Sequence, residues 1–238
     1  MRQPEDVPTA AVVLFAGAVL ATVGNALHPL FEAGVSVESF LEAVEGHGSW
    51  QLLHLTIAVG VVLLAAGIVT VCGDLADTAG SSLAALASTL GAVGASIFAI
   101  QIGGIDGVVM PRLAEAYASG ENPEAVLAAA TGMYALDLAL LALVVTIYVG
   151  GLFLAFGLAL TRADAFAPWV RWLATATGAT GVVIGPMMFL NLADGFTFIA
   201  FRVIALGATV VAFAVATQQV RGTTGIPTTT APPTTTTG

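Results

Sequence analysis

Six polar side chains that could bind a ligand or exchange a proton each lie near one end of a different apolar stretch. They are His28, His54, Gln101, Asp137, Asn191 and Arg202. When the chain is folded back and forth across a bilayer, all six ends fall on the same side. Imidazole, carboxylate and guanidinium groups gathered there could bind or pass a small solute, a proton or an ion.

The predicted pocket consists of five of these residues: His54, Asp137, Arg202, Gln101 and Asn191. Arg202 lies at a depth of roughly 9 Å, and Asp137 and His54 at roughly 6 Å, from the helical rise per residue. A charge at the bilayer centre costs at least ~2.5–3.5 kcal/mol, so such residues normally face protein or water. Because Arg202 and Asp137 have opposite charge and similar depth, we predict an ion pair between them. His28, Gln101 and Asn191 lie so near the boundary that contact with water explains them.

All three histidines fall between residues 28 and 54, which suggests a second use for them. His28 and His54 come from adjacent antiparallel spans, and the glycines beside His47 allow its backbone to approach a ligand closely. Imidazoles placed in this way could bind a divalent transition metal or ligate a haem. The sequence has no HxxxH, HExxH or CxxCH spacing. Interfacial histidines that only form hydrogen bonds are therefore the alternative to a metal- or haem-binding protein.

An intramembrane hydrolase is the second alternative function. Ser49 stands near His47 and His54, and acidic residues are available at the same end. The sequence contains no nucleophile elbow and no metalloprotease helix, which are the motifs that position such groups. The pattern therefore assigns no catalytic residue, names no cofactor, and leans against an enzyme.

The elements that must position these residues are stretches long enough and apolar enough to cross a bilayer. We place them at residues 9–28, 50–72, 82–104, 133–160, 169–192 and 196–217. The predicted fold is therefore all-α, a polytopic transmembrane bundle of six helices. In the fourth stretch, Gly150-Gly151 marks a bend or a close helix contact.

Composition supports integration into a lipid bilayer. Hydrophobic residues make up 58% of the chain and charged residues only 9%, whereas a soluble domain carries about a quarter charged residues. The net charge of -9 argues against nucleic acid or anionic lipid as a partner. Acidic loops without lysine are typical of proteins from high-salt organisms. Cys72, the single cysteine, excludes an intrachain disulfide and is expected to be buried.

Arginine placement predicts how the bundle is oriented. Four of the six arginines fall on the segments that would share a side with the N-terminus: Arg2, Arg162, Arg171 and Arg221. Only Arg112 falls on the opposite loops, so the positive-inside rule predicts a multi-pass cell-membrane protein with both termini cytoplasmic. The leader carries one arginine against Glu5 and Asp6, unlike the positive leader of a signal peptide. The first stretch is therefore expected to be a span.

Short amphipathic helices are predicted in the two larger outer loops. In the first loop, apolar residues recur at helical spacing: Val37, Phe40, Leu41 and Val44. Ser39 and Glu42 have the spacing of a capping box. In the second loop, Pro111 can open a helix. Its apolar face would consist of Met110, Leu113, Ala114 and Tyr117.

The chain divides into a membrane domain and a tail. Residues 1–221 contain the six stretches, and residues 222–238 are rich in threonine and proline. A segment with so little apolar content to pack is expected to be disordered.

One pattern in the first two spans is similar to a known group of proteins. HPLFEAG ends the first span with His28 and Pro29, and WQLLH opens the second with Trp50 and His54. Over residues 1–75 this pattern resembles uncharacterised small polytopic membrane proteins of halophilic archaea and actinobacteria. The resemblance implies a fold of several spans and implies no particular activity.

Overall fold

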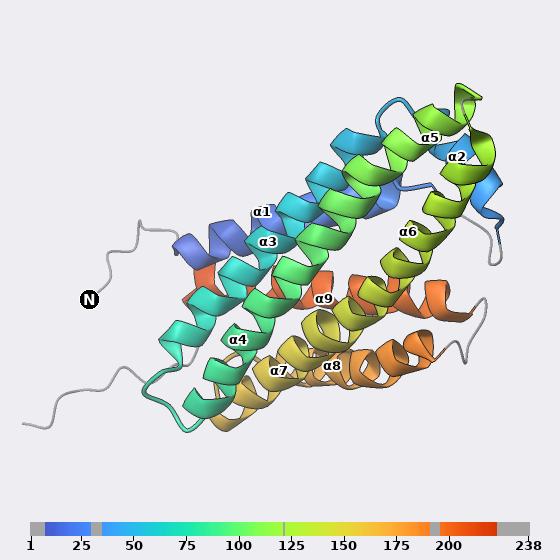
Figure 1. Cartoon of the computed structure of the whole chain (residues 1–238). Helices are drawn as coiled ribbons and strands as arrows, with labels where there is room; N and C mark the ends of the chain where they lie inside the picture. Colours follow the sequence, from blue (N-terminus) through green and yellow to red (C-terminus); the bar gives the residue numbers. More distant parts are fainter. Residues whose placement is uncertain (1–7, 30–34, 121, 191–195, 223–238) are drawn as a thin grey trace, which may run out of the picture.

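The computed structural model describes residues 8–29, 35–120, 122–190 and 196–222, with the backbone alone for 196–201, and these residues form a helical bundle (Figure 1). Its helices that are long and apolar enough to cross a membrane are Thr9–Leu27, Trp50–Asp74, Ser81–Ala118, Pro123–Arg162, Pro168–Phe189 and Arg202–Val220. The chain is therefore a multi-pass membrane protein, and the predicted six-helix fold is confirmed. The predicted tail lies outside the described residues, apart from Gly222.

Helix α1 (Thr9–Leu27) packs along α3 (Trp50–Asp74) through small residues. A Cβ atom on Gly17 would lie 2.5 Å from the Leu64 nitrogen, and one on Gly60 would lie 2.4 Å from the Ala21 nitrogen. Both distances are too short for a real side chain, so glycine is what allows the two backbones to approach. This close contact fixes the position of the first two spans relative to each other.

The third span is one continuous helix that changes its winding. It begins as α4 (Ser81–Phe98), becomes the π-helix η1 (Ala99–Val109) and ends as α5 (Met110–Ala118). The predicted span stops at residue 104, whereas the helix continues to Ala118. It continues because Met110 and Ala114 are buried in a small apolar core outside the main bundle core.

The fourth span also starts earlier than predicted and also contains a π-helix. It runs through α6 (Pro123–Val144), η2 (Val145–Leu152) and α7 (Phe153–Arg162). The close contact predicted at Gly150-Gly151 is confirmed, since a Cβ atom on Gly150 would lie 2.6 Å from the Val182 nitrogen. Val182 belongs to α8 (Pro168–Phe189), which packs on η2 and α7, and α9 (Phe196–Val220) packs on α1 and α8.

Helix α2 (Val37–Glu45) covers one end of the bundle, which we call the α2 end. Phe40, Leu41 and Val44 are buried as predicted, and α2 packs on α5 and α6. The predicted capping box at Ser39 is wrong. The helix starts earlier, because the Ser36 side chain accepts a hydrogen bond from the Ser39 backbone N–H at 3.2 Å.

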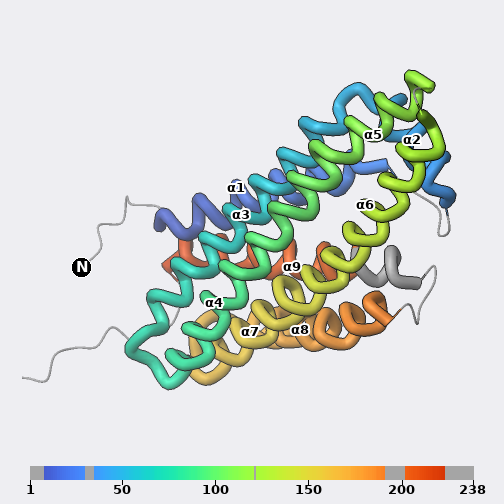
Figure 2. Tube along the Cα trace, in the orientation of Figure 1, coloured from blue at the N-terminus to red at the C-terminus, as the bar shows by residue number. Residues whose placement is uncertain are grey.

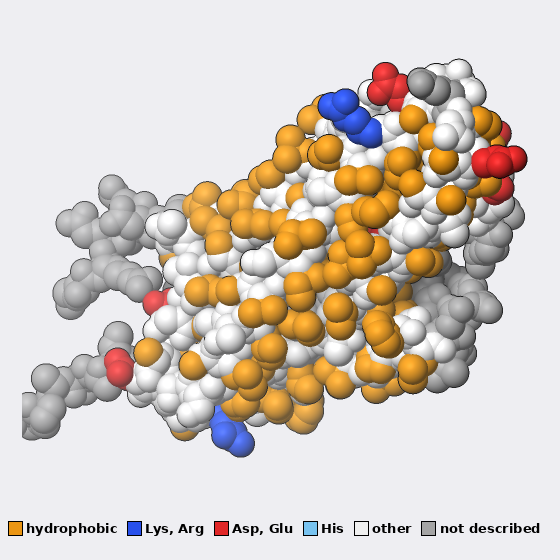
Figure 3. Space-filling model, in the orientation of Figure 1, with side chains coloured by type: hydrophobic (Ala, Val, Ile, Leu, Met, Phe, Trp, Pro, Cys, Tyr) orange, Lys and Arg blue, Asp and Glu red, His pale blue; other side chains and the backbone are white. Residues whose placement is uncertain are grey.

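The surface matches a protein surrounded by lipid. The flank between the two ends of the bundle is largely hydrophobic, and acidic side chains gather at the α2 end (Figure 3). Large apolar side chains such as Phe15, Leu52 and Val203 are more than half exposed. Figure 2 shows that α1 starts and α9 ends at the same end of the bundle, opposite the α2 end.

Candidate functional site

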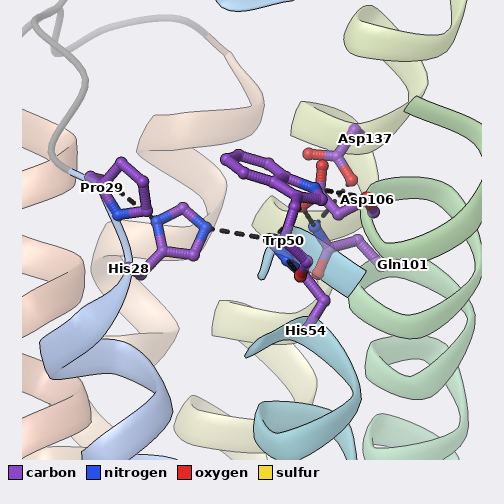
Figure 4. Close-up of polar contacts among 7 residues, drawn as sticks. All are labelled: His28, Pro29, Trp50, His54, Gln101, Asp106 and Asp137. Atoms are coloured by element: carbon purple, nitrogen blue, oxygen red, sulfur yellow. Dashed lines mark hydrogen bonds and ion pairs between the residues drawn. The ribbon is translucent and has the colours of Figure 1, made fainter. Parts of the chain in front are cut away.

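Five polar side chains meet near the α2 end, and we call them the His–Asp cluster: His28, His54, Gln101, Asp106 and Asp137 (Figure 4). They come from the end of α1, from α3, from η1 and from α6, so the cluster joins four helices. His54 is 0% exposed, and Gln101, Asp106 and Asp137 are at most 8% exposed, whereas His28 is partly exposed. Ionisable groups buried in this way inside a membrane protein are energetically costly, which makes the cluster the candidate functional site.

The π-helix η1 places two members of the cluster on one face. Gln101 and Asp106 are five residues apart, and five residues in an α-helix would turn them about 140° away from each other. In η1 the Gln101 Nε2 lies 3.4 Å from the Asp106 carboxylate and 2.7 Å from the Asp137 carboxylate. Gln101 therefore donates to both acids. π-Helical segments are rare and are frequent at functional sites.

The two histidines form a chain of close contacts. His28 Nε2 lies 3.1 Å from His54 Nε2. On the outer side of each ring, Nδ1 faces a backbone carbonyl, that of Pro29 at 2.9 Å and that of Trp50 at 2.7 Å. His54 Nε2 also lies 4.0 Å from the Asp106 carboxylate. The histidines thus connect to the acids through His54.

Trp50 contacts both the histidine side and the acid side of the cluster. Its indole Nε1 donates to the backbone carbonyl of Asp106 at 2.7 Å, which ties α3 to η1. Its ring stacks on His54 with centroids 4.5 Å apart, and the His28 ring lies 5.5 Å away. The Trp50 and His54 pattern seen in the sequence is therefore a direct structural contact.

Arg202 does not join the acids of the cluster. Among the described residues, ion pairs connect Arg171 with Asp164 and His54 with Asp106. The predicted Asp137–Arg202 ion pair is therefore wrong: Arg202 is exposed, and Asp137 accepts from Gln101 instead. A long arginine side chain can keep its charged head in a polar environment without an acidic partner.

The other predicted site residues divide into two groups. The structure brings His54, Asp137 and Gln101 together with His28, whereas Asn191 lies outside the described residues. The interpretation of Gln101 as a residue explained by contact with water is wrong, because it is 2% exposed and bonded to Asp137.

Asp106 is the member of the cluster that the sequence does not predict. The predicted third span ends before it, which places Asp106 among the acids of an outer loop. Its five-residue spacing from Gln101 is the available signal, and that spacing aligns the two side chains only in a π-helix.

The geometry does not identify the histidines as metal or haem ligands. Among the described residues, no three histidine, cysteine, aspartate or glutamate side chains converge in a way that could hold a metal. Axial bonds of about 2 Å on opposite faces of a haem iron would separate the two nitrogens by about 4 Å. The Nε2 atoms of His28 and His54 are 3.1 Å apart, so a haem does not fit between them.

One weak contact is relevant to the hydrolase alternative. Ser49 Oγ lies 3.4 Å from His47 Nε2, beyond the usual hydroxyl range of about 2.5–3.0 Å, and this contact is exposed. The His47 ring is nearly perpendicular to the Trp50 ring, with centroids 6.0 Å apart. His47 therefore lies near Ser49 and outside the His–Asp cluster.

Comparison of the chain with protein-family models, with curated proteins and with solved structures finds no match. The function must therefore be argued from the His–Asp cluster itself.

Proposed function

We propose that this membrane protein reversibly binds a small cation, above all a proton, at the His–Asp cluster. The observation that carries the proposal is the burial of Asp106 and Asp137 without an arginine partner among the described residues. A buried carboxylate in a membrane protein needs a compensating positive charge. The available sources are the histidines and a cation taken up from solution.

The hydrogen bonds of the cluster support this proposal because acceptors outnumber donors. The amide nitrogen of Gln101 serves both carboxylates, so two acids depend on one donor group. The Gln101 Oε1 atom is buried and has no hydrogen-bond partner among the described residues. An unsatisfied buried acceptor costs about 1–3 kcal/mol. A proton or a cation in the cluster would reduce this deficit.

The packing of the cluster favours a small ligand. Its members contact each other directly, at 2.7–4.0 Å, and Trp50 covers them. An organic solute would have to separate these contacts, whereas a proton needs no cavity and a bare ion needs a small one. The cluster is therefore better suited to a cation than to the solute pocket predicted from the sequence.

Binding from one side is favoured over passage across the membrane. Among the described residues, the buried histidine and the buried acids all belong to the cluster, and the remaining buried polar side chains are Thr177 and Gln219. A route to the opposite end would need further polar groups along it. Sensing or storing a cation at the α2 end is therefore the better description.

Thermal unfolding of the full-length protein in detergent micelles tests the proposal. Wild-type Tm is measured across pH at fixed salt, and across sodium and calcium concentrations at fixed pH. Neutralising a buried carboxylate stabilises the fold, and each kcal/mol corresponds to about 2–4 °C for a chain of this size. We expect Asp106→Asn and Asp137→Asn to flatten the pH or ion dependence.

Asp164→Asn is the matched control, because Asp164 is an exposed acid paired with Arg171 away from the cluster. It should keep the wild-type dependence. If both cluster variants respond to pH and to ions as the wild type does, the cluster is not a cation site.

A further inference from the structure

We infer that the His28–His54 pair holds one proton more than two neutral imidazoles carry, shared between the two Nε2 atoms. This inference rests on the proposed function and specifies its ligand at the histidine side of the cluster. It makes His28 and His54 a proton-binding site that joins the end of α1 to α3.

The pair has more hydrogen-bonding contacts than two neutral imidazoles have hydrogens. The pair makes three contacts in a row: Pro29 carbonyl to His28 Nδ1 at 2.9 Å, Nε2 to Nε2 at 3.1 Å, and His54 Nδ1 to Trp50 carbonyl at 2.7 Å. Each contact needs one hydrogen, and the carbonyl oxygens have none to give. A neutral imidazole carries one ring N–H, so two neutral rings supply two hydrogens for three contacts.

No exchange of tautomers removes the shortage. If both Nδ1 atoms carry the hydrogens, two Nε2 lone pairs face each other at 3.1 Å. If one hydrogen moves to Nε2, an Nδ1 lone pair faces a carbonyl oxygen at 2.9 Å or 2.7 Å. His54 is fully buried and His28 partly so, and buried polar groups are hydrogen-bonded in nearly all cases. The geometry therefore describes an imidazole–imidazolium pair.

Groups on every neighbouring element act on this positive charge. The Asp106 carboxylate on η1 lies 4.0 Å from His54 Nε2, and Gln101 connects it to Asp137 on α6. The stacked Trp50 ring on α3 can also stabilise a cation over its face.

Other groups oppose the charge. Burial lowers the pKa of His28 from its ordinary value of 6.5, and the charges of Arg202 on α9 and of His47 act in the same direction, while the Pro29 carbonyl raises it. Because stabilising and opposing groups both face the pair, we expect the added proton to be exchangeable. When it leaves, one of the three contacts loses its hydrogen and the link between α1 and α3 weakens.

Nitrogen NMR of the full-length protein labelled with ¹⁵N-histidine tests the inference directly. The chain has three histidines, so His47→Gln leaves spectra of the pair alone. At about pH 6, near the ordinary range of histidine titration, we expect hydrogens on three of the four ring nitrogens. On raising the pH, the pair should lose one proton in a single step that both rings report.

Two variants sharpen the result. Asp106→Asn removes the facing carboxylate and should move the step to lower pH. In the His28→Gln, His47→Gln double variant, the remaining His54 ring should carry one hydrogen, because the His28 ring that shares the added proton is gone.

Two results would overturn the inference. One is a pair with two ring hydrogens at every pH between about 5 and 8, the range in which histidine charge normally changes. The other is one bound transition-metal ion per chain by elemental analysis, removed by a chelator together with the Nε2–Nε2 contact. If either occurs while the carboxylate variants still flatten the Tm dependence, this inference fails and the proposed function stands.

Discussion

At the scale of single residues, Gln101 is the hydrogen-bond donor that two buried acids share. Its amide nitrogen reaches Asp137 at 2.7 Å and Asp106 at 3.4 Å, so one neutral side chain supplies the donor that an arginine would normally supply. A neutral donor cannot cancel the charge of the acids. The cluster therefore keeps its demand for a proton or another cation, which a permanent arginine would have removed.

Replacement of Gln101 by leucine should destabilise the protein by about 1–3 kcal/mol, because Asp137 is left buried without its donor. The double variant Gln101→Leu, Asp137→Leu should cost less than the sum of the two single variants, because both partners are then removed together. Unfolding titrations of the four proteins in mixed micelles measure this coupling. Additive costs would show that the Gln101–Asp137 hydrogen bond does not stabilise the fold.

The site could be predicted from sequence only where a residue's position along its helix decides its neighbours. His28 and His54 lie at the α2 end of their helices, and Asp137 lies four residues into its predicted stretch, so counting along apolar stretches is enough to bring them together. The presence of Asp106 in the cluster, and its contact with Gln101, depend on the π-helical winding of η1, which no apolar pattern reveals. The prediction for Arg202 is wrong because depth along a helix does not say which way a side chain points.

At the scale of helices, apolar length predicts each span, and tertiary packing decides where each helix ends. The first two spans start and stop within a few residues of the predicted bounds. The third and fourth extend into the polar connection between them, because α5 and the start of α6 share a small core with α2 that includes Met110, Ala114 and Ala130. A hydropathy pattern detects lipid contact and does not detect such a core outside it.

Glycine contacts between helices give a prediction at this scale. A Cβ atom on Gly178 of α8 would lie 2.0 Å from the Leu154 nitrogen of α7, so Gly178→Ala must push the two helices apart. We expect a loss of about 1–3 kcal/mol, the usual cost of overpacking. A Cβ atom on Gly132 of α6 would meet nothing within 4 Å, so Gly132→Ala is the control and should be neutral or slightly stabilising. Equal effects in unfolding titrations would contradict the packing argument.

At the scale of the whole molecule, the six spans place the cluster at one end and three of the five arginines in the described residues at the other. Arg162 ends α7, Arg171 lies in the first turns of α8, and Arg221 follows α9, all at the end opposite α2. The α2 end carries Arg112 together with a larger number of acidic residues. The positive-inside rule predicts that the arginine-rich end faces the cytoplasm.

This orientation determines which compartment supplies the cation. If it is correct, the His–Asp cluster draws its proton or ion from outside the cell and responds to external pH or salt. The opposite orientation would make the same cluster a sensor of the cytoplasm. A measurement of sidedness therefore selects between two physiological roles for one site.

Cysteine labelling in intact cells provides that measurement. Cys72 is 3% exposed, so replacing it by alanine gives a cysteine-free chain with little change in packing. Glu45→Cys places a reporter at the exposed end of α2, and Asp77→Cys places one in the exposed connection between α3 and α4. A membrane-impermeant maleimide should label the residue 45 reporter in intact cells and the residue 77 reporter only after permeabilisation. The reverse pattern would place the cluster on the cytoplasmic side, and labelling of both reporters in intact cells would contradict the six-span topology, because α3 alone separates them.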